Sequence, residues 1–337
     1  MPPCFLNYKC MRIHLIQLFE ETVSRFPEKT AVIDKDRSIS FSDLRQKAVQ
    51  TAATISLKGI PQNRPIGVFL DKSIESVYAD LGILYAGDFY MNLDIKTPAE
   101  RIKNILQLVE PAAIISTSIQ IKTITTVIPE SVKVILLDDE FTVDGLQYTD
   151  DMLSGRRATV IDTDPSCIIN TSGSTGTPKG VVLNHKSFLD FIDWSLETFG
   201  FGEDLVMGSL SPIVFDIYSF ELCMLMAKAS TLVVLPAHLA AFPAKILEVL
   251  EKHRVNFLFW VPTIMVNIAN MDLLSAFRLE SLRTVWFAGE VFPTKQYNYW
   301  HHHLPQVTFA NFYGPIEITL DCTYYIINKE IYSQEIA

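Results

Sequence analysis

The order of apolar and polar residues predicts strands that alternate with helices along most of the chain. Residues 66–70 form a continuous apolar run typical of a buried strand, and apolar side chains then recur at helical spacing over residues 74–84, up to Gly87. Further strand-length runs lie at residues 112–115, 132–137, 255–260 and 284–287. This alternation predicts an α/β fold with one or two largely parallel sheets covered by helices.

Two of the predicted helices carry signals at their ends. Thr97 and Glu100 have the spacing of a capping box, and Pro98 stands at the first helical position between them. A second helix is predicted over residues 188–199 and ends at Gly200. We therefore expect Thr97 to cap the first helix and Gly200 to terminate the second.

The composition fits a protein with a large core. The 337 residues are 49% hydrophobic. If the chain has an internal domain boundary, we expect it in the polar stretch of residues 150–164. The net charge of −10 argues against a nucleic-acid partner. The five scattered cysteines lack metal-ligand spacing and are odd in number, which favours a reducing cytoplasmic location. Residues 1–19 do not resemble a secretory signal, and the apolar run at 232–235 is too short to span a membrane.

A polar, glycine-rich loop separates the apolar runs at residues 167–169 and 181–183. Residues 171–180 are all Thr, Ser, Gly, Pro or Lys, so they offer backbone N–H groups, hydroxyls and an ammonium group to a phosphate chain. The loop is not a Walker A motif, because Pro178 precedes the lysine and Gly180 follows it. The alternative is a flexible surface hairpin, for which the same residue types are common.

A second polar segment, residues 311–319, follows the apolar run at residues 307–310 and contains a Gly-Pro turn. Glu317 supplies one carboxylate after that turn, and Mg²⁺ on nucleotide phosphates usually takes only one or two protein carboxylates. Tyr313 offers an aromatic ring to a nucleotide base. The alternative is a surface turn with an incidental carboxylate.

Two further segments place carboxylates among apolar residues. Burying an unpaired carboxylate is costly, so Asp216 requires a cationic partner such as a ligand ammonium group. An internal ion pair or a role as a helix N-cap would also satisfy it. In the segment 288–290, a glycine at the end of a strand lets a ligand approach the backbone.

In this order, the segments resemble the motifs of the adenylate-forming superfamily. They are most similar to amino-acid adenylation domains of nonribosomal peptide synthetases and to D-alanine–carrier-protein ligases. Residues 171–180 are similar to Thr-Ser-Gly-Ser/Thr-Thr-Gly-x-Pro-Lys-Gly, and residues 311–317 to Asn-x-Tyr-Gly-Pro-Thr-Glu. Residues 215–216 resemble the Phe-Asp pair of the substrate pocket, and residues 288–290 a Gly-Gly-Glu turn. The resemblance implies the large N-terminal part of an AMP-binding adenylation domain over residues 1–337, with two helix-covered sheets in stacked layers.

The resemblance also implies a chemistry. An amino-acid carboxylate would attack the α-phosphorus of ATP, and the acyl group would pass to the phosphopantetheine thiol of a carrier protein. Asp216 would bind the α-ammonium group, Glu317 would bind Mg²⁺, and Thr171 would act in catalysis with Glu317. The implied nucleotide-binding residues are Ser172, Gly173, Ser174, Thr175, Gly176, Lys179, Gly289, Glu290, Asn311, Phe312, Tyr313, Gly314 and Ile316. The implied substrate pocket is lined by Ile217, Phe220, Thr263, Trp286, Ala288, Phe312, Leu320 and Asp321.

Three positions carry separate expectations. The aromatic pocket residues would leave little room for a substrate or would shape a slot for an apolar side chain. Asp321 would pair with a basic or hydroxylated group, unless it is a solvated residue at the pocket rim. Ile316 stands where the family has a threonine that helps to hold the α-phosphate. Losing one such donor costs about 2.7–4 kcal/mol of transition-state stabilisation in a comparable role. Asn92 stands where proline is usual, which we interpret as structural.

The chain stops at Ala337, and the small C-terminal domain that the resemblance implies, with its catalytic lysine, does not follow. We therefore expect either a fragment of a longer enzyme or a truncated gene product. The first hypothesis is an adenylating enzyme of which this chain supplies amino-acid and ATP binding. The alternative is a catalytically silent binding or interaction module that retains the fold. A P-loop type of ATP-binding protein is disfavoured by the missing Walker A motif.

Four histidines are interpreted as structural. Residues 301–303 are consecutive histidines, whose side chains cannot all face one metal ion, so we expect a solvated helix end. His185 follows a predicted strand and matches a histidine common in the family. We expect it to have a structural role.

Overall fold

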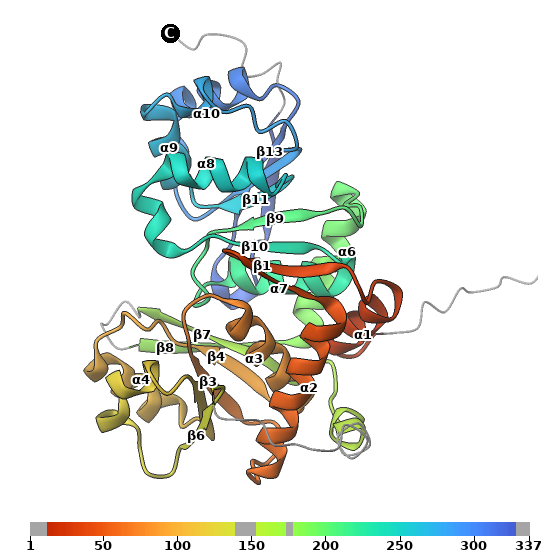
Figure 1. Cartoon of the computed structure of the whole chain (residues 1–337), viewed down its shortest axis with the longest axis vertical. Coiled ribbons are helices and arrows are strands. Elements are labelled where there is room, and N and C mark those ends of the chain that lie inside the picture. The colour runs from red at the N-terminus through yellow and green to blue at the C-terminus, as the bar shows by residue number, and fades with distance from the viewer. Residues whose placement is uncertain (1–11, 139–152, 173–177, 328–337) are drawn as a thin grey trace, which may run out of the picture.

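The computed structural model describes residues 12–138, 153–172 and 178–327, and these form two sheets with helices packed against them (Figure 1). The first sheet contains β1 (Thr30–Asp34), β2 (Arg37–Ser40), β9 (Val206–Ser209), β10 (Thr231–Val234), β11 (Phe257–Trp260), β12 (Thr284–Phe287), β13 (Thr308–Tyr313) and β14 (Thr323–Ile326). The second contains β3 (Pro65–Phe69), β4 (Phe89–Asn92), β5 (Ala113–Ser116), β6 (Lys133–Leu136), β7 (Pro165–Ser172) and β8 (Pro178–Asn184). The principal helices are α1 (Leu15–Arg25), α2 (Phe41–Leu57), α3 (Ile74–Tyr85), α4 (Ala99–Val109), α6 (His185–Phe199), α7 (Asp216–Lys228), α8 (Pro243–Lys252), α9 (Pro262–Asn270) and α10 (Thr294–His303).

Both sheets are mostly parallel. The eight-stranded sheet has the order β14-β13-β12-β11-β9-β10-β1-β2, and the six-stranded sheet has the order β6-β5-β3-β4-β7-β8. Within the described ranges, antiparallel pairing is confined to β1 with β2, β13 with β14 and β7 with β8. The predicted α/β fold with two helix-covered sheets is therefore confirmed.

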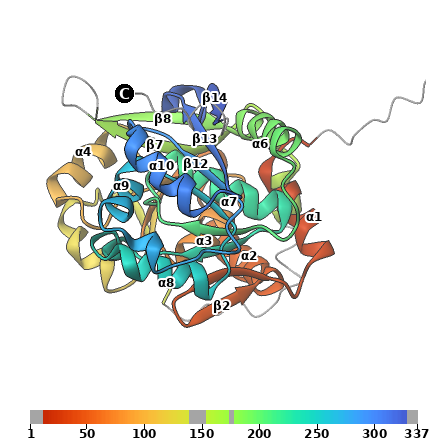
Figure 2. The same cartoon turned by 90° about the horizontal axis from the view of Figure 1, so that it is seen from above.

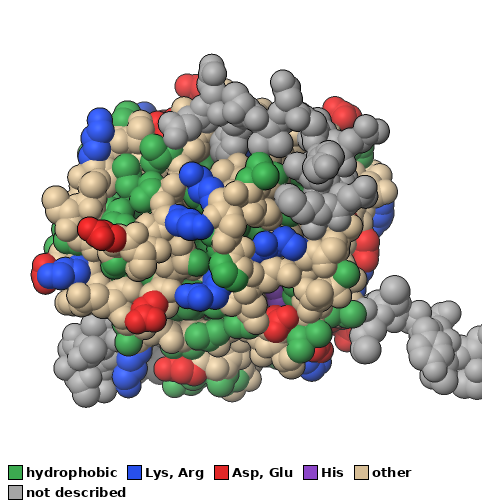
Figure 3. Space-filling model, turned by 90° about the horizontal axis from the view of Figure 1, so that it is seen from below, with side chains coloured by type: hydrophobic (Ala, Val, Ile, Leu, Met, Phe, Trp, Pro, Cys, Tyr) green, Lys and Arg blue, Asp and Glu red, His purple; other side chains and the backbone are tan. Residues whose placement is uncertain are grey.

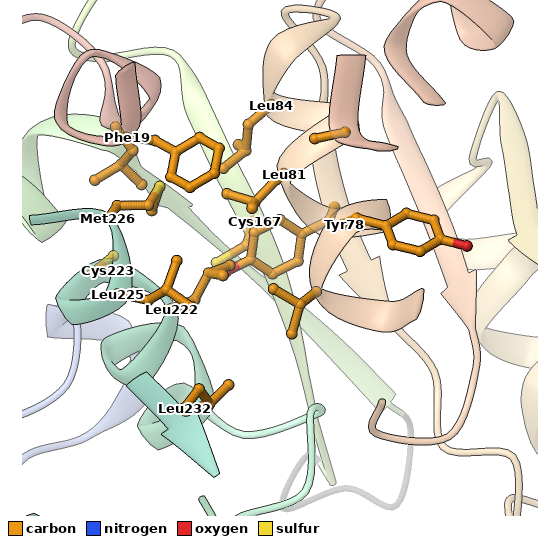
Figure 4. Close-up of a cluster of buried hydrophobic side chains, with 14 of the residues drawn as sticks. Phe19, Tyr78, Leu81, Leu84, Cys167, Leu222, Cys223, Leu225, Met226 and Leu232 are labelled. Atoms are coloured by element: carbon orange, nitrogen blue, oxygen red, sulfur yellow. The ribbon is translucent and has the colours of Figure 1, made fainter. Parts of the chain in front are cut away.

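An apolar cluster between the sheets joins them into one packed unit. Figure 4 shows Leu81 and Leu84 of α3 on the side of Leu222 and Met226 of α7, whereas the Tyr78 ring points away from α7, and all of these side chains are buried. In Figure 1, α7 lies between the two sheets, and Figure 2 shows it near the centre of the molecule from above. Burial of one such side chain contributes about 1.5–3 kcal/mol, so this layer holds the sheets together.

A buried polar network crosses the same layer. The Lys72 ammonium group donates to the Ser211 carbonyl at 2.6 Å and lies 3.4 Å from a Glu221 carboxylate oxygen, which also accepts from the Ser209 hydroxyl. The Lys72 side chain follows β3, whereas Ser209 ends β9 and Glu221 lies in α7. This ion pair therefore links the six-stranded sheet to the eight-stranded one.

The ends of two helices test the cap predictions. Pro98 is the N-cap of α4, with φ −54° and ψ 140°, and no side chain of the described segments caps this helix. The predicted capping role of Thr97 is therefore wrong, because the extended conformation of Pro98 delays the helix by one residue. The predicted end of α6 is confirmed: Gly200 has φ 62° and donates its N–H to the Leu196 carbonyl at 3.1 Å.

Charges of both signs are distributed over the surface. The view from below in Figure 3 shows Lys and Arg side chains near the centre of that face, with acidic side chains around them. Among the helices of the described segments, none combines the length and the apolar character needed to cross a bilayer. Residues 153–164 connect β6 and β7 of the same sheet. The internal boundary expected at residues 150–164 stays a prediction.

Candidate functional site

A cavity of about 520 Å³ opens where several parallel strands end. Its lining includes residues that directly follow β9, β11 and β12, and ligands in α/β sheets usually bind outside the carboxyl ends of strands. The predicted site residues on its wall are Asp216, Ile217, Thr263, Ala288, Gly289, Glu290, Gly314, Ile316 and Asp321. The prediction missed Leu210, Ser211, Pro212, Ala237, Ala240, Phe259, Trp260, Val261, Ile264 and Asn267. The strand ends at residues 209 and 260 were the signal that could have found several of them.

Asp216 occupies the first position of α7, on the cavity wall. Its carboxylate accepts a hydrogen bond from the Ile217 N–H at 2.9 Å, and Phe215 is the N-cap residue, so the N-cap alternative for Asp216 is wrong. Burial raises the pKa of Asp216, and backbone N–H groups at the helix start oppose that rise. Within the described ranges, no lysine or arginine forms an ion pair with it. A positively charged ligand would therefore supply what the protein does not.

Asp321 lines the same cavity and is half-buried. Burial, and after it the charge of Asp216, raises the pKa of Asp321 to about 7. Asp321 is therefore less exposed than a fully solvated residue at the pocket rim would be. Two acidic groups thus influence each other across this cavity.

The turn after β12 is fixed by a contact to α9. Gly289 has φ 84°, a conformation that strains any residue with a side chain, and among the described atoms only Val261 comes within 4 Å of the position where a Cβ would lie. The Glu290 carboxylate accepts from the Thr263 N–H at 2.9 Å and from the Thr263 hydroxyl. Glu290 therefore holds the first turn of α9, and the backbone at Gly289 stays open toward the cavity.

At the turn after β13, the backbone of Leu320 and Asp321 passes very close to Gly314. A Cβ on Gly314 would lie 2.3 Å from the Leu320 carbonyl oxygen and 2.4 Å from the Asp321 Cα. Only glycine fits there. Asn311 and Tyr313 are exposed on one face of β13, as the predicted adenine contacts require, whereas Phe312 points into the core. Glu317 is exposed in the short 3₁₀ helix η5 (Ile316–Ile318).

Four predicted pocket residues lie in the core instead of on the cavity wall: Phe220, Trp286, Phe312 and Leu320. The Trp286 ring lies 4.3 Å from that of Phe312 and 5.1 Å from that of Phe220, centroid to centroid, in a cluster of aromatic side chains. Packing against one another buries these rings more effectively than facing the cavity. Their contact with a substrate stays a prediction.

The predicted phosphate loop joins β7 to β8, as expected for a loop between two strands. Thr171 pairs with Lys179 across this antiparallel hairpin, and Lys179 is exposed. Gly173, Ser174, Thr175 and Gly176 lie outside the described residues, and of Ser172 only the backbone is described. The Thr319 hydroxyl donates to that of Ser187 at 2.9 Å, which fastens the turn carrying Glu317 to the helix that follows β8. The phosphate contacts stay predictions.

The structural interpretations of His185 and Asn92 are confirmed. His185 is buried, and its Nδ1 accepts from the Leu15 N–H at 3.3 Å; burial lowers its pKa to about 3. Asn92 is buried and donates to the Asp80 carboxylate at 3.2 Å. His301 to His303 form the last residues of α10, the helix end that the sequence predicts.

A larger groove of about 1010 Å³ lies elsewhere, near the amino ends of β11 and β12. Charged residues such as Glu251, Arg254 and Arg278 line much of it, and the described residues on its wall include none of the predicted site residues. Because parallel sheets bind ligands at the opposite ends of their strands, we take the smaller cavity as the candidate site.

The fold and the position of this cavity are those of an α/β protein that binds its ligand at the carboxyl ends of parallel strands. The chain belongs to the AMP-binding enzyme family, whose model matches residues 19–335. It is 29% identical to tyrocidine synthase 1 of Brevibacillus parabrevis over 91% of this chain and 27% of that protein. It is 27% identical to an L-proline–[L-prolyl-carrier protein] ligase of Pseudomonas fluorescens over 90% of this chain and 61% of that protein.

Solved structures show the same fold. A nonribosomal peptide synthetase, FmoA3, in its α-methyl-L-serine-AMP bound form, superposes with a TM-score of 0.81 at 22% identity over 94% of this chain and 34% of that one. IdnL7 gives a TM-score of 0.80 at 22% identity over 95% and 64%. The chain thus spans less than two thirds of the length of each of these relatives.

Proposed function

We propose that the chain is the amino-acid- and ATP-binding part of an enzyme that activates an amino-acid carboxylate as an aminoacyl-adenylate. The acyl group then passes to the phosphopantetheine thiol of a carrier protein. The observation that carries this proposal is Asp216, a half-buried carboxylate on the wall of a cavity at the strand ends, without a cationic partner among the described residues.

The arrangement favours an amino acid over a simple carboxylic acid. An α-ammonium group placed against Asp216 would offset the cost of burying that carboxylate. The helix start at α7 fixes the carboxylate, and the open backbone at Gly289 leaves room beside it for a flat base. Catalysis would then rest on aligning the substrate carboxylate with the α-phosphorus and on neutralising charge there.

Mg²⁺ fits the exposed carboxylate of Glu317. This ion reaches such sites with nucleotide phosphates and needs only one or two protein carboxylates, which a single exposed glutamate supplies. When bound, it would neutralise phosphate charge. Thr171 and Lys179 lie at the ends of the loop that would hold the departing pyrophosphate. Ile316, which lines the cavity, offers no hydroxyl to the α-phosphate.

The role of Asp216 is tested by equilibrium binding of amino acids to the wild-type chain and to Asp216→Asn. We expect the variant to lose at least about 30-fold in affinity, because truncating one side of a buried charge pair costs about 2–5 kcal/mol. Asp190→Asn, at an exposed ion pair on α6, is the matched control and should bind as the wild type does. Unchanged binding by Asp216→Asn would remove the basis of the proposal.

Exchange of labelled pyrophosphate into ATP separates activity from binding. Exchange that depends on an amino acid and on Mg²⁺ would show that this chain forms the adenylate by itself. Amino-acid binding without exchange would mean that this chain alone does not form the adenylate, and would favour the silent binding module.

A further inference from the structure

A second cavity, of about 270 Å³, shares Asp321 with the candidate site. Its other walls are largely aromatic, from Phe191, Trp194, Phe312 and Tyr324. The Trp194 and Tyr324 rings are 4.9 Å apart, and the Phe312 ring lies 5.9 Å from that of Tyr324, centroid to centroid. Asp321 therefore stands between the amino-acid cavity and an aromatic box.

A carboxylate beside several aromatic rings is an environment that suits a cation. Aromatic rings attract ammonium and guanidinium groups through their negative faces, and the carboxylate adds a full countercharge. In the part of the chain that the structure describes, no lysine, arginine or histidine lines either cavity. Asp216 and Asp321 thus carry two potential negative charges, and a single α-ammonium group neutralises only one.

We propose that Asp321 and the aromatic cavity bind a cationic group on the side chain of the substrate, so that the substrate class is a diamino acid or a guanidino amino acid. This inference rests on the proposed function, in which Asp216 takes the α-ammonium group. Asp321 is then the specificity-determining residue, and Trp194 and Tyr324 lie on the wall beside the second cation.

The electrostatics of the site agree with this assignment. Burial and the Asp216 charge both oppose ionisation of Asp321 and hold its pKa at about 7. A cation in the aromatic cavity would favour the ionised form of Asp321 and so offset both effects. A neutral side chain would leave the half-buried Asp321 carboxyl without a countercharge.

The experiment compares matched pairs of amino acids by isothermal titration calorimetry on the whole chain. L-ornithine is paired with L-norvaline, and L-lysine with L-norleucine, because each pair differs only in the side-chain ammonium group. We expect at least one cationic member to bind tenfold or more tightly than its neutral partner. Asp321→Asn should reduce that ratio to about one. Trp194→Leu should reduce it by about threefold to tenfold, through loss of one ring face.

The outcomes separate the two proposals. Neutral amino acids that bind as tightly as their cationic partners, in an Asp216-dependent manner, would overturn this inference and leave the proposed function intact. A cationic preference that survives in Asp321→Asn, with circular dichroism showing both proteins folded, would overturn it too. Absence of binding by every amino acid to folded wild-type protein would overturn the proposed function, and this inference with it.

Discussion

Asp80 is a buried carboxyl whose surroundings favour the protonated form. One of its oxygens accepts from the Tyr218 hydroxyl at 2.8 Å and from the Asn92 amide at 3.2 Å. The other oxygen and the Asn92 carbonyl oxygen find no donor among the described residues. A carboxyl proton would supply the missing donor. Burial accordingly raises the pKa of Asp80 from 3.8 to about 7.

The raised pKa predicts a stability that falls with pH. The unfolded chain releases the Asp80 proton near pH 3.8 and the folded chain only near pH 7, so the free energy of unfolding decreases between these values and is level above them. Asp80→Asn removes this dependence. We expect the free energy of unfolding of the variant, relative to that of the wild type, to be higher at pH 8 than at pH 5 by about 2.5 kcal/mol.

Urea unfolding at both pH values measures this difference. Asp36→Asn, at an exposed turn, is the control and should show the same pH dependence as the wild type. An equal effect of Asp80→Asn at pH 5 and pH 8 would mean that the carboxyl is ionised in the folded protein throughout.

At the scale of one element, the turn after β13 depends on Gly314. The returning chain passes so close that a Cβ would lie 2.3 Å from the Leu320 carbonyl oxygen. The Leu320 carbonyl oxygen and the Asp321 Cα are both backbone atoms, so no change of side-chain rotamer can relieve the contact. We expect Gly314→Ala to lower the free energy of unfolding by about 1–3 kcal/mol or more, measured by denaturant titration.

Gly155→Ala is the matched control for that substitution. No atom of the described residues lies within 4 Å of the position that its Cβ would take, so the variant should be neutral or slightly stabilising. If both alanine variants had the same stability, the close backbone contact at Gly314 would not contribute to the free energy of unfolding.

At the scale of the whole molecule, the Lys72–Glu221 pair links the two sheets. Both side chains are buried, at 7% and 1% exposure, so removing one leaves a charge without compensation. We expect Lys72→Met to cost about 3–5 kcal/mol of unfolding free energy. Lys72→Met combined with Glu221→Gln should cost less than Lys72→Met alone.

Chemical denaturation of the single and double variants tests this coupling. Lys186→Met, which breaks an exposed pair with Asp190, serves as the control and should cost no more than about 1 kcal/mol. A double variant less stable than Lys72→Met would show that the charge of Glu221 is compensated by other groups.

The sequence predicts the local elements better than the contacts between distant ones. Apolar runs locate β3, β5, β6, β11 and β12 to within two residues, because burial in parallel sheets requires continuous apolar strands. The Lys72–Glu221 pair could not be predicted, since its partners are 149 residues apart and no spacing relates them.

In the candidate site, too, the sequence predicts which residues are involved better than it predicts their contacts. Asp216 stands out as a carboxylate among apolar residues, whereas Asp321 is indicated only by the resemblance to the family's pocket. Trp286 and Phe220 were expected on the pocket wall, and the structure packs them into the core, because a motif indicates a neighbourhood and not the direction of a side chain.

The close crossing at Gly314 would tie the proposed substrate choice to the proposed nucleotide contacts. Asp321 and Glu317 lie on one short segment whose backbone has almost no freedom where it passes that glycine. If the proposed function holds, re-engineering the chain for a different amino acid through position 321 would therefore also disturb the turn that carries Glu317, the proposed magnesium ligand. Libraries that vary residues 316–321 together should yield active variants more often than libraries that vary position 321 alone.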